Sequence, residues 1–232
     1  MNNEFVVLSD IHGNYPALQE VVDTEGYDKE YMVLGDIHGL NAYPEQTLDL
    51  VKEISNFTLA GNHDKAIFEL GEGHVNSDKL SEFELYHTLS NLNSNDVEWM
   101  LDLSHLGVIQ RDDSRICITH AYPFPETASG YEAGNGGVDK GSVTEVASVV
   151  GDDYDYVMHG HTHEQYELNC QRFGHDVHFI NPGTLGYEGK YAVVYTDTND
   201  VELKTVDYHY DKVKQHIASV LPSDAPPVNS WF

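Results

Sequence analysis

Cysteine and long hydrophobic runs are scarce in this sequence of 232 residues. Its two cysteines, Cys117 and Cys170, form no CxxC pair and no disulfide framework, which predicts a reducing, cytoplasmic setting. No apolar run approaches the roughly 20 residues that a membrane-spanning helix requires. Residues 1–4 carry no basic side chain of the kind that opens a signal peptide. We therefore expect a cytoplasmic protein that does not enter a membrane.

Basic residues are also few, because 12 lysines and arginines stand against 39 aspartates and glutamates, a formal charge of −27. Such a surface repels nucleic-acid backbones and anionic lipids, so general nucleic-acid binding and membrane binding are not expected. The acidic residues are spread along the whole chain, which favours halophilic adaptation to a high-salt cytoplasm. An ordinary acidic protein is the alternative.

Short apolar runs alternate with helical patterns along much of the chain, which predicts an α/β fold. Asn14 is placed to cap a helix with Pro16 in its first turn, and a second helix is expected from about Pro44. After His163 the chain becomes rich in strands. The expected strands are residues 5–8, 31–34, 57–60, 116–119, 156–158, 177–180, 191–195 and 201–206.

The expected organisation is one domain over residues 1–210, with a helical excursion at about 65–103, followed by a helical or extended tail over residues 211–232. Residues 130–141 are rich in glycine and form either a mobile lid over a substrate or a surface loop. The tail ends in Trp231 and Phe232, which either dock on a surface or remain disordered.

Clusters of His, Asp and Asn directly follow the first expected strands. In open α/β sheets, ligands bind at the carboxyl ends of strands, so such clusters converge on one crevice. The clusters are Asp10 to Asn14, Gly35 to Gly39, Gly61 to Asp64, His120, and His159 to His163.

The residue types in these clusters suit divalent metal ions. Carboxylates can bridge two ions, imidazoles bind Mn, Fe, Ni and Zn, and an amide oxygen can complete a coordination shell. Within Asp10-x-His12 and His161-x-His163, extended backbone would turn both side chains the same way. The candidate ligands are Asp10, His12, Asp36, Asn62, His120, His161 and His163.

The motifs DxH, GDxxG, GNHD, a single His and GHxH occur here in this order. With the phrases Ser9 to Asn14 and Asn181 to Thr184, they resemble the calcineurin-like metallophosphoesterase superfamily, in particular its small prokaryotic phosphodiesterases and phosphatases. The resemblance extends from about Val6 to Tyr208. It implies a four-layer αββα sandwich, in which two facing mixed β-sheets are flanked by helices.

The resemblance also implies two metal sites that share a bridging carboxylate. His63 would face the scissile phosphate, and Asp64 would orient the His63 ring. Two Mn²⁺ ions are the first expectation, with Ni²⁺, Fe or Zn²⁺ as alternatives. The ligands implied are Asp10, His12, Asp36 and His163 for one ion, and Asp36, Asn62, His120 and His161 for the other.

We therefore expect a dinuclear metal-dependent phosphodiesterase whose partner is a small-molecule or nucleotide phosphoester. Protein phosphatases of this superfamily carry phosphate-gripping arginines near the positions of Leu40 and Ala60, whereas the arginines here are Arg111, Arg115 and Arg172. This difference favours a phosphodiester over a phosphomonoester. The alternatives are a phosphomonoesterase or serine/threonine protein phosphatase, and a catalytically silent protein-binding scaffold, against which the intact His63 of the GNHD motif argues.

Two further histidines lie inside the motifs. His38 either supports the pocket from behind, lies exposed, or lines the pocket. His159 is expected to point away from the cleft.

Overall fold

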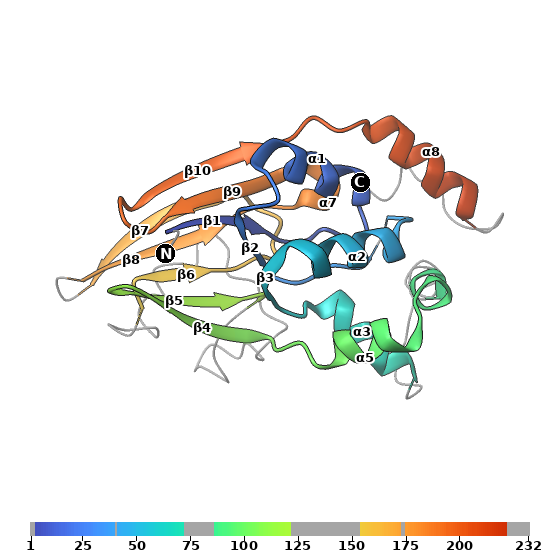
Figure 1. The fold of residues 1–232 in the computed structure, drawn as a ribbon, viewed down its shortest axis with the longest axis horizontal. Coiled ribbons are helices and arrows are strands. Elements are labelled where there is room, and N and C mark those ends of the chain that lie inside the picture. Colours follow the sequence, from blue (N-terminus) through green and yellow to red (C-terminus); the bar gives the residue numbers. More distant parts are fainter. Residues whose placement is uncertain (1–2, 40, 72–85, 122–153, 173–174, 222–232) are drawn as a thin grey trace.

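The computed structural model describes residues 3–39, 41–71, 86–121, 154–172 and 175–221. Within them, two five-stranded sheets face each other, with helices along an outer side (Figure 1). The glycine-rich segment 130–141 and residues 222–232 of the tail lie outside the described residues. The predicted α/β sandwich of two facing mixed sheets with helices is confirmed.

The first sheet has the strand order β10-β9-β1-β2-β3. The central strand β1 (Glu4–Leu8) runs parallel to β2 (Glu30–Val33), which runs parallel to β3 (Ser55–Thr58). On its other side, β1 pairs antiparallel with β9 (Lys190–Tyr195), and β9 pairs antiparallel with β10 (Asp200–Thr205). The parallel part of this sheet directs three strand ends to the same edge.

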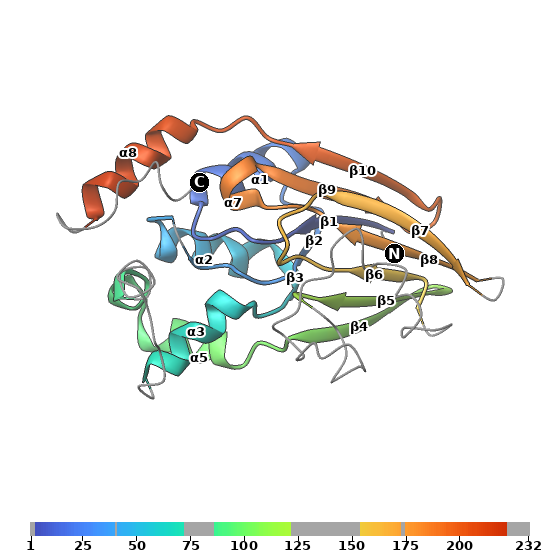
Figure 2. The same ribbon diagram turned by 180° about the vertical axis from the view of Figure 1, so that it is seen from behind.

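The second sheet has the strand order β4-β5-β6-β8-β7. Its three inner strands, β5 (Ser114–Thr119), β6 (Tyr156–Met158) and β8 (His175–Asn181), are parallel to one another. Its edges are the antiparallel strands β4 (Leu106–Arg111) and β7 (Tyr166–Arg172). Figure 2 shows this second sheet from behind, with β7 and β8 nearer the viewer.

Alternation along β1 builds two cores on the two faces of the first sheet. Val6 and Leu8 face the helices, whereas Phe5 and Val7 face the second sheet. The core between the sheets is completed from the second sheet by Ile109, Ile116, Ile118, Tyr156, Met158 and Ile180.

Helices α1 (Tyr15–Glu25), α2 (Pro44–Ile54) and the short α7 (Leu185–Glu188) contribute to the outer core of the first sheet. Asn14 caps α1 as predicted, since its side chain accepts a hydrogen bond of 3.2 Å from the Ala17 N–H, and a proline lies in the first turn. The predicted start of the second helix at a proline is also confirmed.

The described part of the predicted helical excursion contains α3 (Asn62–Gly71) and α5 (Ser94–Leu101), and the start of the predicted tail forms α8 (Tyr210–Val220). Among the residues that the structure describes, every helix is too short or too polar to cross a bilayer.

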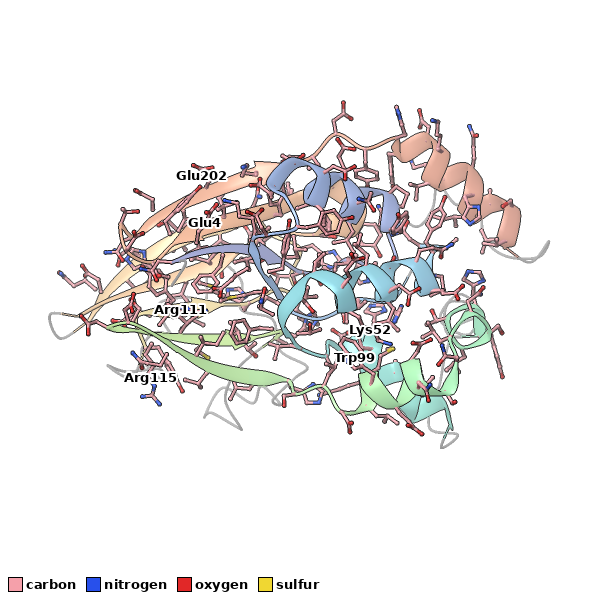
Figure 3. The ribbon with its side chains drawn as sticks, in the orientation of Figure 1. Glu4, Lys52, Trp99, Arg111, Arg115 and Glu202 are labelled. Carbon is pink, nitrogen blue, oxygen red and sulfur yellow. The ribbon has the colours of Figure 1, made fainter. Side chains whose placement is uncertain are left out.

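An ion pair attaches α5 to the outer helix α2. The Lys52 ammonium donates to the Asp96 carboxylate at 2.6 Å and lies over the Trp99 ring, 5.1 Å from its centre (Figure 3). Asp96 also accepts from the Asn93 N–H in a capping box at the start of α5.

Candidate metal centre

The candidate ligands lie where strands of the two sheets end. Asp10, Asp36 and Asn62 follow β1, β2 and β3, which are parallel. His120 and His161 follow β5 and β6, which are parallel in the other sheet. The His161 N–H donates to Asp10 Oδ2 at 3.0 Å, so the two sheets are joined at this edge. The predicted convergence of these side chains is confirmed.

A first cluster contains Asp10, His12 and His163. His163 Nε2 lies 3.1 Å from Asp10 Oδ1, and His12 Nε2 lies 3.2 Å from His163 Nε2. His12 Nε2 is also 3.9 Å from Asp10 Oδ1. These ligand atoms lie within 4.8 Å of one another, a spacing that suits coordination of one ion.

A second cluster contains Asp36, Asn62, His120 and His161. Asn62 Oδ1 lies 3.0 Å from His120 Nε2 and 2.8 Å from His161 Nδ1. His120 Nε2 is in turn 3.3 Å from Asp36 Oδ2. Asp36 also groups with His12 of the first cluster, with ligand atoms within 4.8 Å, so this carboxylate lies between the two clusters.

Backbone carbonyls hold the other ring nitrogen of two histidines. His12 Nδ1 lies 3.3 Å from the His38 carbonyl, and His120 Nδ1 lies 2.9 Å from the Leu34 carbonyl. A ring that donates from Nδ1 in this way presents its Nε2 lone pair to the cluster. The Nε2 atoms of both rings therefore point into the cluster, where they could bind a metal ion.

Burial and charge shift the pKa values of these groups in opposite directions. Burial lowers the pKa of His12 to about 4. Burial also acts to lower the pKa of His120, but the neighbouring Asp36 carboxylate outweighs it and raises the value to about 9. The pKa of Asp36 is lowered, because His120 and the other nearby imidazoles outweigh the effect of burial. The carboxylates therefore remain charged within a buried cluster.

Five candidate ligands adopt left-handed backbone, with φ of 53° at Asp10, 50° at His12, 50° at Asp36, 69° at His161 and 59° at His163. The prediction that extended backbone aligns the paired ligands was therefore wrong. Residues other than glycine rarely adopt this conformation, which costs about 1–3 kcal/mol each and concentrates at functional sites. The loops thus hold their ligands in place at a cost to folding stability.

Glycines allow the loops to approach one another closely. A β-carbon at Gly61 would collide with the Asp36 carboxylate, and one at Gly160 would collide with the Ser9 hydroxyl. The close approach of these loops therefore requires glycine at both positions.

Asp64 has a different contact from the one that the resemblance implied. Its carboxylate accepts backbone hydrogen bonds from Gly61 (2.9 Å), His38 (3.0 Å) and Ile37 (3.2 Å). The expected bond to the His63 ring is not among the contacts of the described residues. Burial, reinforced by Asp36, raises the pKa of Asp64 to about 6. Its position ties the loop after β2 to the loop after β3.

His63 lies beside both clusters. Its backbone N–H donates to Asp36 Oδ1 at 2.8 Å, and its ring meets the His12 ring edge-on with centres 4.9 Å apart. The ring is partly exposed. Its ligand atom also lies within 4.8 Å of those of His12 and Asp36, close enough to share an ion with them.

The two remaining motif histidines are buried. His159 Nε2 lies 2.8 Å from the Tyr166 hydroxyl oxygen, and burial lowers the pKa of His159 to about 4. Asn181 supports the same loop by donating to the Gly160 carbonyl at 3.1 Å and to the Thr162 hydroxyl at 3.0 Å. His38 is buried, and neither ring nitrogen has a hydrogen-bond partner among the described residues.

Sequence patterns gave no indication of Tyr187, which also belongs to this site. Its ring stacks on that of His12 with centres 5.0 Å apart, and it is tilted against that of His163 at 5.4 Å. Tyr187 belongs to the four-residue helix α7, which has no motif that could have identified it.

The donor set fits a pair of divalent ions. It combines carboxylate, imidazole and amide donors, which are the ligand types of Mn, Fe, Ni and Zn sites. Asp10 Oδ1 is fully buried, and the imidazole nitrogens of His163 and His12 lie 3.1 Å and 3.9 Å from it. Burying a charged carboxylate is costly unless a positive charge lies beside it, and a bound metal ion would supply that charge.

Comparison with known proteins agrees with this geometry. The profile of the family described as calcineurin-like phosphoesterase matches residues 4–165. No curated protein matches the chain. Among solved structures, a metallophosphoesterase from Sphaerobacter thermophilus is similar over 99% of this chain and 98% of its own, with 20% identity and a TM-score of 0.74.

Two further solved structures are similar. A hypothetical protein from Pyrococcus horikoshii covers 95% of each chain with 21% identity and a TM-score of 0.74. An archaeal phosphodiesterase covers 88% of this chain and 99% of its own, with 17% identity and a TM-score of 0.50. At these levels of sequence identity, the similarity concerns the fold alone.

Proposed function

Because this chain belongs to the calcineurin-like phosphoesterase family, we propose that it hydrolyses phosphoester bonds with two divalent metal ions. The observation that carries the proposal is the position of Asp36 between two ligand clusters. The ligand sets are Asp10, His12, Asp36 and His163 for one ion, and Asp36, Asn62, His120 and His161 for the other.

Two bound ions would supply an activated water and a positive clamp for the phosphoryl oxygens. The chain's own residues then have separate tasks. His63 lies beside both clusters and donates a hydrogen bond to a phosphoryl oxygen or a proton to the leaving alkoxide. Asp64 keeps the loops after β2 and β3 together, so that Asp36 and Asn62 stay in register.

The proposed substrate is a small phosphodiester. A phosphomonoester dianion is commonly gripped by arginines, but two of the three arginines are engaged elsewhere. Arg111 donates to Glu30 at 2.8 Å and Arg115 lies over the Tyr154 ring, at the end of the strands away from α2 (Figure 3). A phosphomonoesterase or protein phosphatase is the second candidate, and no role in nucleic-acid or membrane binding is proposed.

A metal-by-substrate panel tests the proposal. The metal-stripped protein is reloaded with Mn²⁺, Ni²⁺, Fe²⁺ or Zn²⁺ and assayed on a bis-aryl phosphodiester and an aryl phosphomonoester, in low salt and in molar KCl. We expect the highest rate of hydrolysis with Mn²⁺ on the diester. A halophilic adaptation of the acidic surface predicts, in addition, that the protein has higher thermal stability in molar KCl than in low salt.

Each outcome of the panel separates the candidates. Faster hydrolysis of the monoester would replace the diester proposal by that of a phosphatase. Stoichiometric metal binding without hydrolysis of either ester would favour the scaffold, and an absence of metal binding would overturn the dinuclear site itself.

A further inference from the structure

The ring of Tyr187, which belongs to α7, lies against one side of the first ligand cluster. It lies 5.0 Å from the His12 ring at an interplanar angle of 26°, which is a stacked arrangement. It also lies 5.4 Å from the His163 ring at 48°. Tyr187 therefore contacts both imidazoles assigned to the first ion, while its side chain remains half-buried.

The backbone that carries Tyr187 is fixed to the first motif. The Gly186 N–H donates to the Asp10 carbonyl at 2.9 Å, and the Thr184 hydroxyl donates to the same carbonyl at 3.1 Å. A β-carbon on Gly186 would lie 2.7 Å from the Ile11 carbonyl oxygen. This close packing leaves α7 little freedom to move relative to the DxH loop.

Side chains hold the same turn from its other side. Asn14 Nδ2 donates to the Gly186 carbonyl at 2.7 Å. The Tyr208 hydroxyl lies 3.2 Å from that carbonyl and 3.1 Å from the carbonyl of Tyr187 itself. The Tyr187 ring is thus presented by a turn that is hydrogen-bonded from two separate parts of the chain.

We infer that Tyr187 is a positioning residue for the first metal ion, because its ring restrains the imidazoles of His12 and His163. The inference rests on the proposed dinuclear site and assigns to that site a residue outside its motifs. His12 is already held at Nδ1 by the His38 carbonyl. The Tyr187 ring, stacked on the His12 ring, limits how far the imidazole can tilt or rotate. Residues behind metal ligands typically change metal affinity by 10–100-fold when they are replaced.

The test compares Tyr187→Leu with Tyr187→Phe in the full-length, metal-stripped protein. Mn²⁺ binding is measured by titration calorimetry, and the visible absorption spectrum is recorded with Co²⁺ in place of Mn²⁺. We expect Tyr187→Leu to weaken one of two Mn²⁺ binding events by about 10-fold or more and to change the Co²⁺ spectrum. Tyr187→Phe retains the ring and should bind Mn²⁺ with the affinities of the wild type.

Tyr27→Leu is the matched control, since this tyrosine follows the C-terminus of α1 and is 54% exposed. It should leave both Mn²⁺ affinities unchanged. Tyr187→Leu with wild-type affinities and spectrum would overturn the inference, even if its melting temperature fell. Equal weakening by Tyr187→Phe would overturn the role given to the ring.

Failure of the wild type to bind two Mn²⁺ ions would instead overturn the proposed function, and this inference with it. The two failures are therefore distinguished by the wild-type titration alone.

Discussion

The two ends of the sandwich are built in different ways. At the carboxyl ends of the parallel strands, Asp10, His12 and Asp36 are buried together on left-handed backbone. At the opposite end, charged groups form partly solvated pairs, such as Lys29 with Glu4 at 2.7 Å and Arg111 with Glu30 at 2.8 Å. Figure 3 places Glu4 and Arg111 away from Lys52 and α2.

This difference indicates that the ligand end of the sandwich lowers the free energy of unfolding more than the opposite end does. Buried like charges and left-handed backbone each cost free energy, and bound cations would compensate for both. The partly solvated ion pairs at the other end contribute on the order of 1 kcal/mol each and need no bound ligand. The ligand end should therefore respond strongly to metal and to substitution, whereas the opposite end should respond weakly.

The largest effect is expected at the shared carboxylate. Asp36→Asn should lower the Mn²⁺ stoichiometry below two and reduce kcat by more than about 100-fold, since changes behind metal ligands already cost 10–100-fold. Elemental analysis beside steady-state rates measures both. Asp49→Asn, on the exposed face of α2, is the control. Full metal content in Asp36→Asn would contradict the bridging role.

His63→Ala separates catalysis from metal binding at the same end. We expect kcat to fall by about 10²–10⁴-fold, the range typical of a group that transfers or shares a proton in the transition state. Metal content should remain near that of the wild type. Because the His63 ring also lies within reach of His12 and Asp36, loss of one metal ion in this variant would make His63 a ligand.

The sequence predicted the convergence at the ligand end, because strand, polar cluster and glycine follow one another in a short stretch of chain. It did not predict how the ligands are held. Left-handed φ at Asp10 or His163 could not be read from residue type, since Asp and His adopt this conformation more often than most residues but still only in a minority of cases. The family resemblance implied that Asp64 orients the ring of the neighbouring His63. In the structure its carboxylate accepts hydrogen bonds from the backbone N–H groups of Ile37 and His38, which lie 27 and 26 residues away along the chain.

The elements that the sequence analysis missed lie at the sheet edges or in short turns. Strand β4 has only one buried residue, Ile109, so its pattern lacks the apolar run that identified β1. Strand β7 interleaves Glu167, Asn169 and Gln171 with its apolar residues and forms the other edge of the same sheet. The four residues of α7 are too few for a helical period.

Acid should destabilise the ligand end through its buried histidines. Burial lowers the pKa of His159 from 6.5 to about 4 in the folded protein. Between these pH values the unfolded chain binds a proton that the folded protein does not, so stability is complete above pH 6.5 and falls as the pH drops toward 4. This shift corresponds to about 3 kcal/mol.

Comparison with His159→Gln isolates this contribution, because the glutamine amide can form a hydrogen bond with the Tyr166 hydroxyl in either direction but does not titrate. Urea unfolding of the metal-free proteins should show a shallower loss of stability in the variant. Parallel pH dependence of the two proteins would mean that other groups, such as His12, carry the effect.

Asp64→Asn tests the role of this carboxylate. The amide keeps the shape but cannot accept all three backbone hydrogen bonds, so the variant should lose about 1–3 kcal/mol of stability. If Asp64 acts through the loops, Mn²⁺ affinity should fall together with stability. A reduced kcat with unchanged Mn²⁺ affinity and unchanged stability would instead favour the expectation that Asp64 acts by orienting His63.

The smallest effect is expected from Arg111→Leu at the opposite end of the sandwich. This change removes the ion pair with Glu30 and the contact over the Phe5 ring, 5.1 Å from its centre, while retaining apolar volume. The free energy of unfolding should change by about 1 kcal/mol or less, because the pair is partly solvated. Mn²⁺ affinity and kcat should stay at wild-type values, since the ligand loops do not depend on this contact. A loss of metal binding in Arg111→Leu would mean that the two ends are coupled through the sheets, and that the division between a strained functional end and a simply paired end does not hold.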